Sequence, residues 1–324
     1  MGANPRVVLL TDQAMEGHRS PGHPERPERL AAAASGVADG AAEAGATLDR
    51  PPLEPADEAA LERVHPAPYL ALLDDAARQG GGWVDADTYI GPESMVAARL
   101  AAGATIQAAL AAAGGDAEVA FAVVRPPGHH ARRERAAGFC LLNNVAVATL
   151  ALRAAGRAQR IAILDWDVHH GDGTQSIFDA DPEVCYASTH QMPMYPGSGE
   201  SSERGTGPAI GTKHNVPLSP GSGDAAFTDA WLARLLPAVG AFAPDAILVS
   251  AGYDAHRLDP LANLDVTEAG YREVAEAIGL MARSAGLGGV ALTLEGGYDL
   301  DALRDGAAAT VAGLLAGLSG SEAG

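Results

Sequence analysis

The sequence predicts an α/β protein with a three-layer, doubly wound and mostly parallel sheet. Three observations support this fold class: short aliphatic runs, Ala- and Leu-rich stretches between them, and polar residues directly after several of the runs. Strands that are buried on both faces are apolar along their whole length, as these runs are. Their alternation with helices is typical of a parallel sheet that is covered by helices on both sides.

The predicted strands are six short runs of β-branched and other aliphatic residues, at 7–10, 120–124, 161–164, 184–187, 247–249 and 290–294. The predicted helices are the Ala- and Leu-rich stretches at 25–45, 94–113, 141–156, 224–239, 267–283 and 301–318. We find no internal repeat and no linker. We therefore expect a single domain over residues 1–324, in which residues 319–324 form a flexible tail.

One segment interrupts the alternation. Residues 190–224 contain seven Gly and five Pro, and a connection of this length is usually functional or mobile. In open α/β sheets, ligands bind outside the carboxyl ends of the strands. The residues that follow the predicted strands are therefore the first candidates for a functional site.

Charge and composition exclude several classes of protein. The chain has 22 Lys and Arg against 41 Asp and Glu, a net charge of −19, which is unfavourable for a protein that follows nucleic-acid phosphates. The two cysteines form no disulfide framework, and the apolar run at 7–10 is too short for a signal peptide, so we expect a cytoplasmic protein. The most apolar stretch, 95–113, contains Arg99 and Gln107 and predicts an amphipathic or buried helix rather than a membrane span. We expect no nucleic-acid or membrane partner, and the sequence leaves a homo-oligomer open.

Unusual polar residues follow four of the predicted strands. The sequence continues as RPPGHH at 125–130, DWDVHHGDGT at 165–174, SAGYDAH at 250–256 and EGGYD at 295–299. Because the carboxyl ends of parallel strands meet at one edge of a sheet, these clusters are expected to converge.

The second cluster has the spacing of a partial metal site. In extended backbone, residues i, i+2 and i+4 point to one face, so Asp165, Asp167 and His169 point together. Carboxylates and one imidazole suit a divalent ion such as zinc, and Asp254 after the 247–249 strand is the natural further ligand. Such a set leaves open the coordination position that a catalytic zinc requires. The alternative is that Asp165 and Asp167 only cap the following turn.

Two adjacent histidines suit acid–base chemistry. His129 and His130 follow a Pro-Pro-Gly turn, and the unperturbed pKa of histidine lies near neutrality. Asp165 and Asp172 are the carboxylates available to orient the two imidazoles. Tyr298, after two glycines, could donate its hydroxyl to an oxyanion. Each of these side chains taken alone could equally be structural.

Taken together, these motifs and GFC at 138–140 resemble the zinc-dependent deacetylase family of histone deacetylases, acetylpolyamine amidohydrolases and acetoin-utilisation proteins. The resemblance covers about residues 11–318. GHPERPERL at 22–30 is most similar to the class II branch and its bacterial members. The resemblance implies the arginase/deacetylase fold and one catalytic zinc ion, and it makes a structural potassium ion an expected cofactor.

The resemblance also implies individual roles. Zinc ligands would be Asp167, His169 and Asp254, in agreement with the strand-face argument. The implied catalytic residues are the general base and acid His130, its electrostatic partner His129, the carboxylates Asp165 and Asp172 behind them, and Tyr298.

Further residues would bind the substrate and potassium. Gly138 would offer its carbonyl to the substrate amide, Phe139 and Tyr195 would flank a narrow tunnel, and Leu261 would stand at its gate. One potassium ion would lie near the oxygens of Asp165, Asp167, His169 and Ser188. A second monovalent site would use the backbone carbonyls of Phe178 and Val184.

We therefore expect a zinc-dependent amidohydrolase that removes acetyl or short acyl groups from acylated primary amines, above all from acetyl-lysine in proteins or peptides. Acetylpolyamines are the alternative substrate class, since the net charge of −19 attracts polycations. Two other readings are a non-hydrolytic acyl-lysine binding protein and an arginase-like two-metal hydrolase. The second lacks an Asp two residues beyond Asp254-Ala-His, where Arg257 and Leu258 stand.

Overall fold

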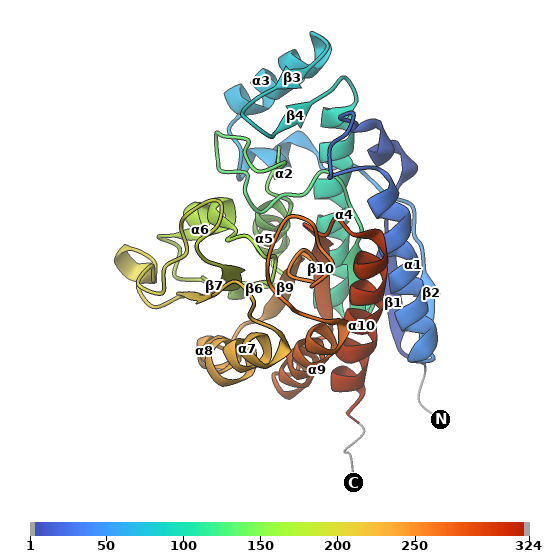
Figure 1. Cartoon of the computed structure of the whole chain (residues 1–324), viewed down its shortest axis with the longest axis vertical. Helices are drawn as coiled ribbons and strands as arrows, with labels where there is room; N and C mark the ends of the chain where they lie inside the picture. Colours follow the sequence, from blue (N-terminus) through green and yellow to red (C-terminus); the bar gives the residue numbers. More distant parts are fainter. Residues whose placement is uncertain (1–3, 321–324) are drawn as a thin grey trace.

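The computed structural model describes residues 4–320 and contains one large, fully parallel sheet (Figure 1). Its eight strands lie in the order β2-β1-β5-β10-β9-β6-β7-β8. The strands of this sheet are β1 (Arg6–Leu10), β2 (Thr47–Asp49), β5 (Val119–Ala122), β6 (Ile161–Asp165), β7 (Val184–Gln191), β8 (Lys213–Leu218), β9 (Ala246–Ala251) and β10 (Val290–Leu294). A separate antiparallel pair, β3 (Gly82–Trp83) and β4 (Tyr89–Ile90), forms a small hairpin.

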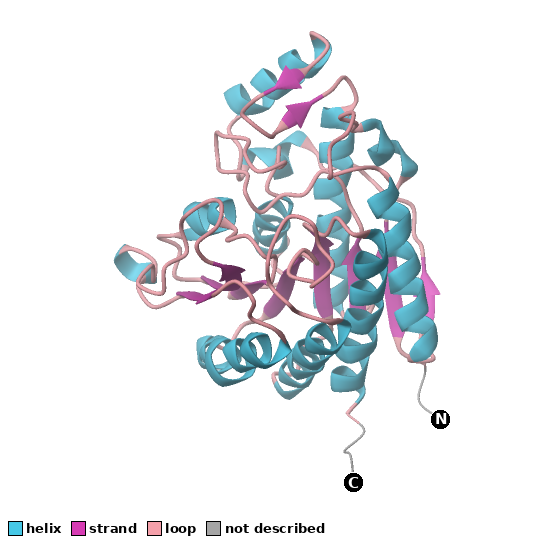
Figure 2. Ribbon diagram, in the orientation of Figure 1, coloured by secondary structure: helices cyan, strands magenta, loops and turns pink. Residues whose placement is uncertain are grey.

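Helices cover both faces of the sheet and complete the three predicted layers (Figure 2). Crossovers between parallel strands are right-handed, so the direction in which the chain moves along the sheet decides the face of each helix. One face carries α4 (Ser94–Gly114), α5 (Asn144–Ala154) and α6 (Asp172–Phe178). The other carries α1 (Glu28–Glu43), α7 (Asp224–Asp229), α8 (Leu236–Phe242), α9 (Glu268–Ser284) and α10 (Leu300–Ser319). The short helices α2 (Glu58–Glu62) and α3 (Ala67–Arg78) and the 3₁₀ turns η1 (Gln13–Gly17) and η2 (Gly207–Ala209) lie in connections.

The six predicted strands and six predicted helices are present, but the sequence did not predict α2, α3, α6 or the β3–β4 hairpin, and the structure differs from the prediction in other places. The edge strands β2 and β8 were not predicted, and β8 lies within the segment 190–224 that we expected to be a loop. The helix predicted at 224–239 is divided by a π-helical segment, η3 (Ala230–Leu235). Pro237 explains that division, because proline has no N–H and clashes with the carbonyl one turn earlier. Of the expected tail, Ser319 belongs to α10, and residues 321–324 lie outside the described residues.

Small residues allow α10 to pack closely between α1 and α9, which lie on either side of it (Figure 1). A Cβ atom at Gly40 of α1 would collide with the backbone carbonyl of Ala308, and one at Gly313 of α10 would collide with that of Arg272. The helix backbones therefore approach more closely than alanine would permit at either position.

The long helix α4 belongs to the protein core. Among the helices of residues 4–320 it alone is apolar and long enough to cross a membrane, but 67% of its most apolar window is buried inside the protein. It packs on β1, β5 and β10 beside α5. This agrees with the prediction of an amphipathic or buried helix in this part of the sequence.

A buried ion cluster joins the N-terminal segment to the sheet. Glu25 lies between Arg29 of α1 and Arg125 of the loop after β5, and no more than 2% of any of the three is exposed. Arg29 Nη1 donates to Glu25 at 2.9 Å and Arg125 Nη2 donates at 2.6 Å. Burial alone would raise the pKa of Glu25, but the two guanidinium groups hold it at about 2. Because losing one partner would leave a buried charge uncompensated, the three residues act as a unit.

Candidate active site

The polar clusters converge at the carboxyl edge of the sheet, because β5, β10, β9 and β6 are consecutive in it. A cavity of about 250 Å³ lies there. Its lining includes eight residues singled out from the sequence: His129, His130, Gly138, Phe139, His169, Tyr195, Leu261 and Tyr298. The structure thus brings together residues that are up to 169 positions apart in the chain, from His129 to Tyr298.

Three of the predicted ligands form a cluster with metal-site dimensions. Asp167, His169 and Asp254 each offer one atom, and the three atoms lie within 4.8 Å of one another. His169 Nδ1 lies 3.1 Å from Asp167 Oδ1 and 3.2 Å from Asp254 Oδ2. In the part of the chain that the structure describes, this is the one such cluster. Asp165, which the strand-face argument grouped with them, instead faces His129 at 3.1 Å.

The cluster fits a divalent cation. Asp254 is fully buried, and its Oδ1 accepts the Val168 N–H at 2.9 Å, whereas its Oδ2 has no hydrogen-bond partner among residues 4–320. Burial opposes protonation of His169, yet the neighbouring carboxylates of Asp167 and Asp254 raise its pKa to about 10. The two carboxylates therefore create a strongly negative potential at the cluster. Two carboxylate oxygens and one imidazole nitrogen are a donor set that zinc accepts.

The two adjacent histidines have separate carboxylate partners. His129 Nδ1 lies 3.1 Å from Asp165 Oδ2, and His130 Nδ1 lies 2.8 Å from Asp172 Oδ1. The ring centroids of the two histidines are 4.1 Å apart. Each Nδ1 is thus engaged by a carboxylate, as the sequence predicted for the pair.

The surroundings give the two imidazoles different charges. Burial lowers the pKa of His129, but the carboxylates of Asp167 and Asp165 outweigh it and raise that pKa well above its ordinary value. Burial and the neighbouring charge of His129 lower the pKa of His130 to about 3. These surroundings favour the protonated form of His129 and the neutral form of His130, which can accept a proton.

Two glycines let the loop that carries Tyr298 approach the three candidate metal ligands. A Cβ atom at Gly296 would collide with Asp254 Oδ2, and the Gly296 N–H donates to Asp167 Oδ2 at 2.8 Å. Arg29 Nε donates to the Gly297 carbonyl at 2.6 Å, and its guanidinium lies 5.0 Å from the centre of the Tyr298 ring. Burial raises the pKa of Tyr298 well above its ordinary value, so its hydroxyl stays protonated and can donate.

The cavity walls are aromatic and closely packed. Gly138 has a φ of 53° and lies against His130, where a Cβ atom would collide with the imidazole ring. Phe139 follows with a φ of 68°, which is unusual for a bulky residue and often marks a functional site. Its ring lies edge-on to Tyr298 with centroids 5.9 Å apart. The Tyr195 ring, 5.0 Å from that of His130, is 43% exposed and stands at the mouth.

The residues expected around potassium are also placed by the fold. Ser188 of β7 lies in register with Asp165 of β6, near the candidate metal ligands. At the expected second site the arrangement differs from the expectation: the Val184 carbonyl accepts a hydrogen bond from the Lys213 ammonium, and the Phe178 carbonyl accepts the Asp181 N–H.

Comparison with known proteins decides the family. Residues 23–314 match the family described as "Histone deacetylase domain". The chain belongs to the histone deacetylase family. As expected for that family, it is 40% identical over 295 residues to a "Probable deacetylase" of Archaeoglobus fulgidus, an alignment that covers 91% of this chain and 81% of that protein.

Solved structures of the family have the same fold. The crystal structure of the HDA15 HD domain aligns with a TM-score of 0.86 and 38% identity, covering 94% of this chain and 89% of that one. An acetylpolyamine aminohydrolase from Burkholderia pseudomallei aligns with a TM-score of 0.83 and 31% identity, covering 95% and 98%. The predicted fold class and family are therefore confirmed, and the chain is a deacetylase-family protein.

The sequence did not reveal three residues of this deacetylase site. Asp87, between β3 and β4, lines the cavity. Glu295 accepts the N–H groups of Gly128 and His129 at 2.7 and 3.1 Å and so holds the histidine loop. Asp259 accepts the N–H of Tyr298 at 2.7 Å and that of Leu261 at 3.0 Å, although its sequence neighbourhood was considered only for Leu261. No local spacing marks these contacts in the sequence.

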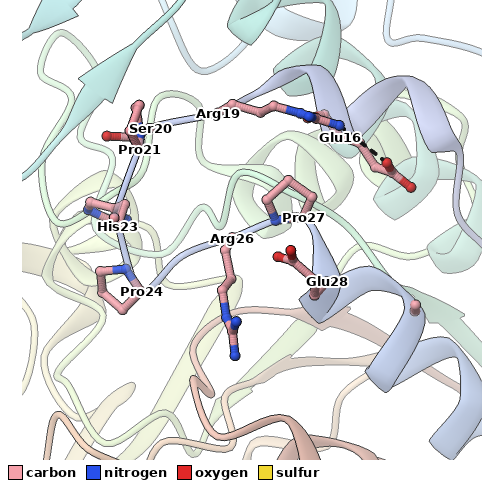
Figure 3. Close-up of a pocket in the computed structure, with 11 residues that line it drawn as sticks. Glu16, Arg19, Ser20, Pro21, His23, Pro24, Arg26, Pro27 and Glu28 are labelled. Atoms are coloured by element: carbon pink, nitrogen blue, oxygen red, sulfur yellow. Dashed lines mark hydrogen bonds and ion pairs between the residues drawn. The ribbon is translucent and has the colours of Figure 1, made fainter.

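A larger hollow of about 810 Å³ lies over the segment that precedes and begins α1 (Figure 3). Arg19 in its wall pairs with Glu16 at 3.5 Å, and Arg26 and Glu28 lie across from them. His23 of this hollow lies edge-on to Phe139, with centroids 4.4 Å apart, and so supports the wall of the deacetylase cavity from outside. Neither the three candidate metal ligands nor the adjacent histidines His129 and His130 line this hollow.

Replacing His169 or Asp254 with alanine is expected to abolish divalent-metal binding, because each removes one of three protein ligands. Metal content after dialysis, measured by mass spectrometry, tests this. His170→Ala is the matched control, since His170 bonds to Ser198 and Gln175 and should be dispensable for the metal. Full occupancy in both ligand variants would contradict the assignment.

Asp259→Ala is expected to lower kcat by about 10- to 100-fold with little change in KM, because misplacing a reacting group by about 1 Å can cost that much. Asp259→Asn, which keeps one acceptor oxygen, should recover part of the rate. If Asp259 acts through Tyr298, adding Asp259→Ala to Tyr298→Phe should cost no further kcat. A second, multiplicative loss in the double variant would contradict this positioning role.

Proposed function

We propose that the chain is a zinc-dependent deacetylase that removes acetyl or short acyl groups from acylated primary amines, with acetyl-lysine in proteins or peptides as the main substrate. The observation that carries the proposal is that His130, engaged through Nδ1 by Asp172, lies beside a three-ligand cluster, and that both face one aromatic-walled cavity. A non-hydrolytic acyl-lysine reader would have no need of a neutral base held by its own carboxylate.

Zinc would be held by Asp167, His169 and Asp254. When bound, it would supply Lewis acidity for the acyl carbonyl and for the attacking water. The cluster offers ligands for one ion, which favours this chemistry over an arginase-like site with two metals.

His130 moves the proton. As a neutral base engaged through Nδ1 with Asp172, it would accept a proton from the water whose oxygen bonds to the acyl carbon. When the C–N bond breaks, the same proton goes to the leaving amine, which departs neutral, and the acyl group leaves as the acid. His129, held as a cation by Asp165 and Asp167, opposes build-up of positive charge on His130 and so returns the proton readily.

Tyr298 would stabilise the transition state. Its hydroxyl is protonated, its ring lines the cavity, and the loop is held by Arg29 and Asp259. An O–H fixed before the reaction can donate to the acyl oxygen as negative charge develops on it. Gly138 would accept the substrate amide N–H through its carbonyl.

Our order of substrates, acetyl-lysine before acetylpolyamine, depends on the residues at the cavity entrance. Leu261 at the cavity rim is apolar, and together with Phe139 and Tyr195 it suits an acyl-lysine alkyl chain. Asp87 on the same rim could instead attract a polyamine cation, and one structural relative is an acetylpolyamine aminohydrolase. We rank acetyl-lysine first because Leu261, Phe139 and Tyr195 give this part of the lining more apolar surface than the one carboxylate of Asp87 offsets, and the net charge of −19 acts only as a diffuse field. A potassium ion near Asp165, Asp167, His169 and Ser188, and a cytoplasmic location, complete the proposal.

Tyr298→Phe is expected to lower turnover by about 10²- to 10³-fold, the usual cost of losing one oxyanion donor. Its zinc content and melting temperature should stay close to those of the parent, because only one hydroxyl is removed. Turnover of an acetyl-lysine peptide together with metal analysis tests this. Unchanged turnover would refute the role of Tyr298.

A competition panel tests the function itself. Zinc-loaded enzyme should hydrolyse acetyl-lysine peptides in preference to longer acyl-lysines and acetylated polyamines, and a chelator should abolish the activity. Leu261→Glu should raise the ratio of polyamine to peptide turnover, since an acid at the gate attracts a polycation. Activity confined to acetylpolyamines would overturn the substrate ranking, and binding of acetyl-lysine without turnover would favour the reader.

A further inference from the structure

A buried ammonium group lies outside the active site. Lys213 is the only lysine of the chain and the first residue of the edge strand β8. Its side chain is fully buried, although lysine is among the residues that are almost never buried without a partner. Such a group needs a specific reason, because removing a charge from water is costly.

The ammonium is satisfied by neutral oxygens. Lys213 Nζ donates to the Val184 carbonyl at 2.7 Å, to Thr212 Oγ1 at 2.7 Å and to the Asp181 carbonyl at 3.3 Å. These three acceptors match the three N–H donors of an ammonium group. None is a carboxylate: the Asp181 carboxylate pairs with Arg153 at 2.5 Å instead. Backbone carbonyls and a hydroxyl are the oxygens with which proteins replace the hydration shell of an alkali cation.

The oxygens around the Lys213 ammonium lie where the family resemblance places an ion site. The family resemblance implies a second monovalent cation at the carbonyls of Phe178 and Val184, in the turn between α6 and β7. Here one of those carbonyls is already bonded to a cation of the chain itself. A monovalent ion at the same carbonyl would be repelled by the ammonium at short range. The residues present therefore do not fit a second ion.

We propose that the ammonium of Lys213 replaces the second monovalent cation, so that this chain carries that charge covalently and needs no potassium there. The geometry is that of a protonated amine, because Nζ faces three acceptor oxygens and the Thr212 hydroxyl gives its own proton to the Ala209 carbonyl. The ammonium joins the α6–β7 turn to the start of β8. Asp181 of this turn donates its N–H to the carbonyl of Phe178, the last residue of α6.

Two variants of Lys213 separate this proposal from a purely structural role. Lys213→Ala opens space at the carbonyls, whereas Lys213→Met, the matched control, fills that space with apolar atoms. Bound Rb⁺ per chain is measured after equilibrium dialysis, and melting temperature is measured in KCl and in tetramethylammonium chloride of equal ionic strength. Lys213→Ala should bind one more Rb⁺ per chain than the parent, and its melting temperature should be higher in KCl than in tetramethylammonium chloride. Lys213→Met should do neither.

Equal Rb⁺ content in the parent and Lys213→Ala, with no response of the variant to KCl, would overturn the proposal. If Lys213→Ala does not fold in either salt, the proposal is tested on the unmodified protein instead. Selective ¹⁵N-lysine labelling gives a single side-chain signal, because there is one lysine. A slowly exchanging ammonium signal with at most one bound Rb⁺ supports the proposal, whereas a neutral amine or two bound Rb⁺ overturns it. These readouts do not depend on enzymatic activity.

Discussion

The active site depends on the burial of several carboxylates at one edge of the sheet. Asp165, Asp167, Asp254 and Glu295 are each no more than 1% exposed. Unpaired buried anions cost several kcal/mol each, so the fold is stable only with compensation by cations and N–H groups. The chain supplies part of this compensation through His129 and through backbone N–H groups such as that of Gly296. What remains is a negative potential at Asp254 and Asp167 that suits a divalent ion. Burial, with the charges of Asp165 and Asp167, also raises the pKa of Glu295 to about 7.

The same constraint produces the difference between the two adjacent histidines. His129 faces two carboxylates and carries a proton, whereas His130 faces Asp172, whose other oxygen accepts from Arg132 at 2.7 Å. Burial, and then the neighbouring charge of His129, lower the pKa of His130 despite its own carboxylate partner, whose charge is shared with Arg132. A pair of identical residues at adjacent positions thus acquires opposite protonation states from the elements packed around it.

The proposed metal site and the surroundings of Lys213 are built from different kinds of ligand. At the carboxyl edge, the ligands are charged and buried, and they face a cavity through which a substrate can enter. At the α6–β7 turn, the ligands are neutral carbonyls closed off from solvent, and on our proposal a side-chain ammonium serves in place of an ion. Only the first site needs an exchangeable coordination position, because only there would a substrate bind.

The sequence by itself determined the apolar strands, the alternation with helices and the positions of the ligands, because those depend on local patterns of side chains. It did not reveal β2 or β8, which are short or contain Pro217, features tolerated at a sheet edge but absent from the pattern of a buried strand. Only the tertiary structure decided that Asp165 faces His129, that Asp259 holds Tyr298 across 39 residues, and that Lys213 reaches Val184. These contacts join residues from different loops and strands, and which of them meet is fixed by the order of the strands in the sheet.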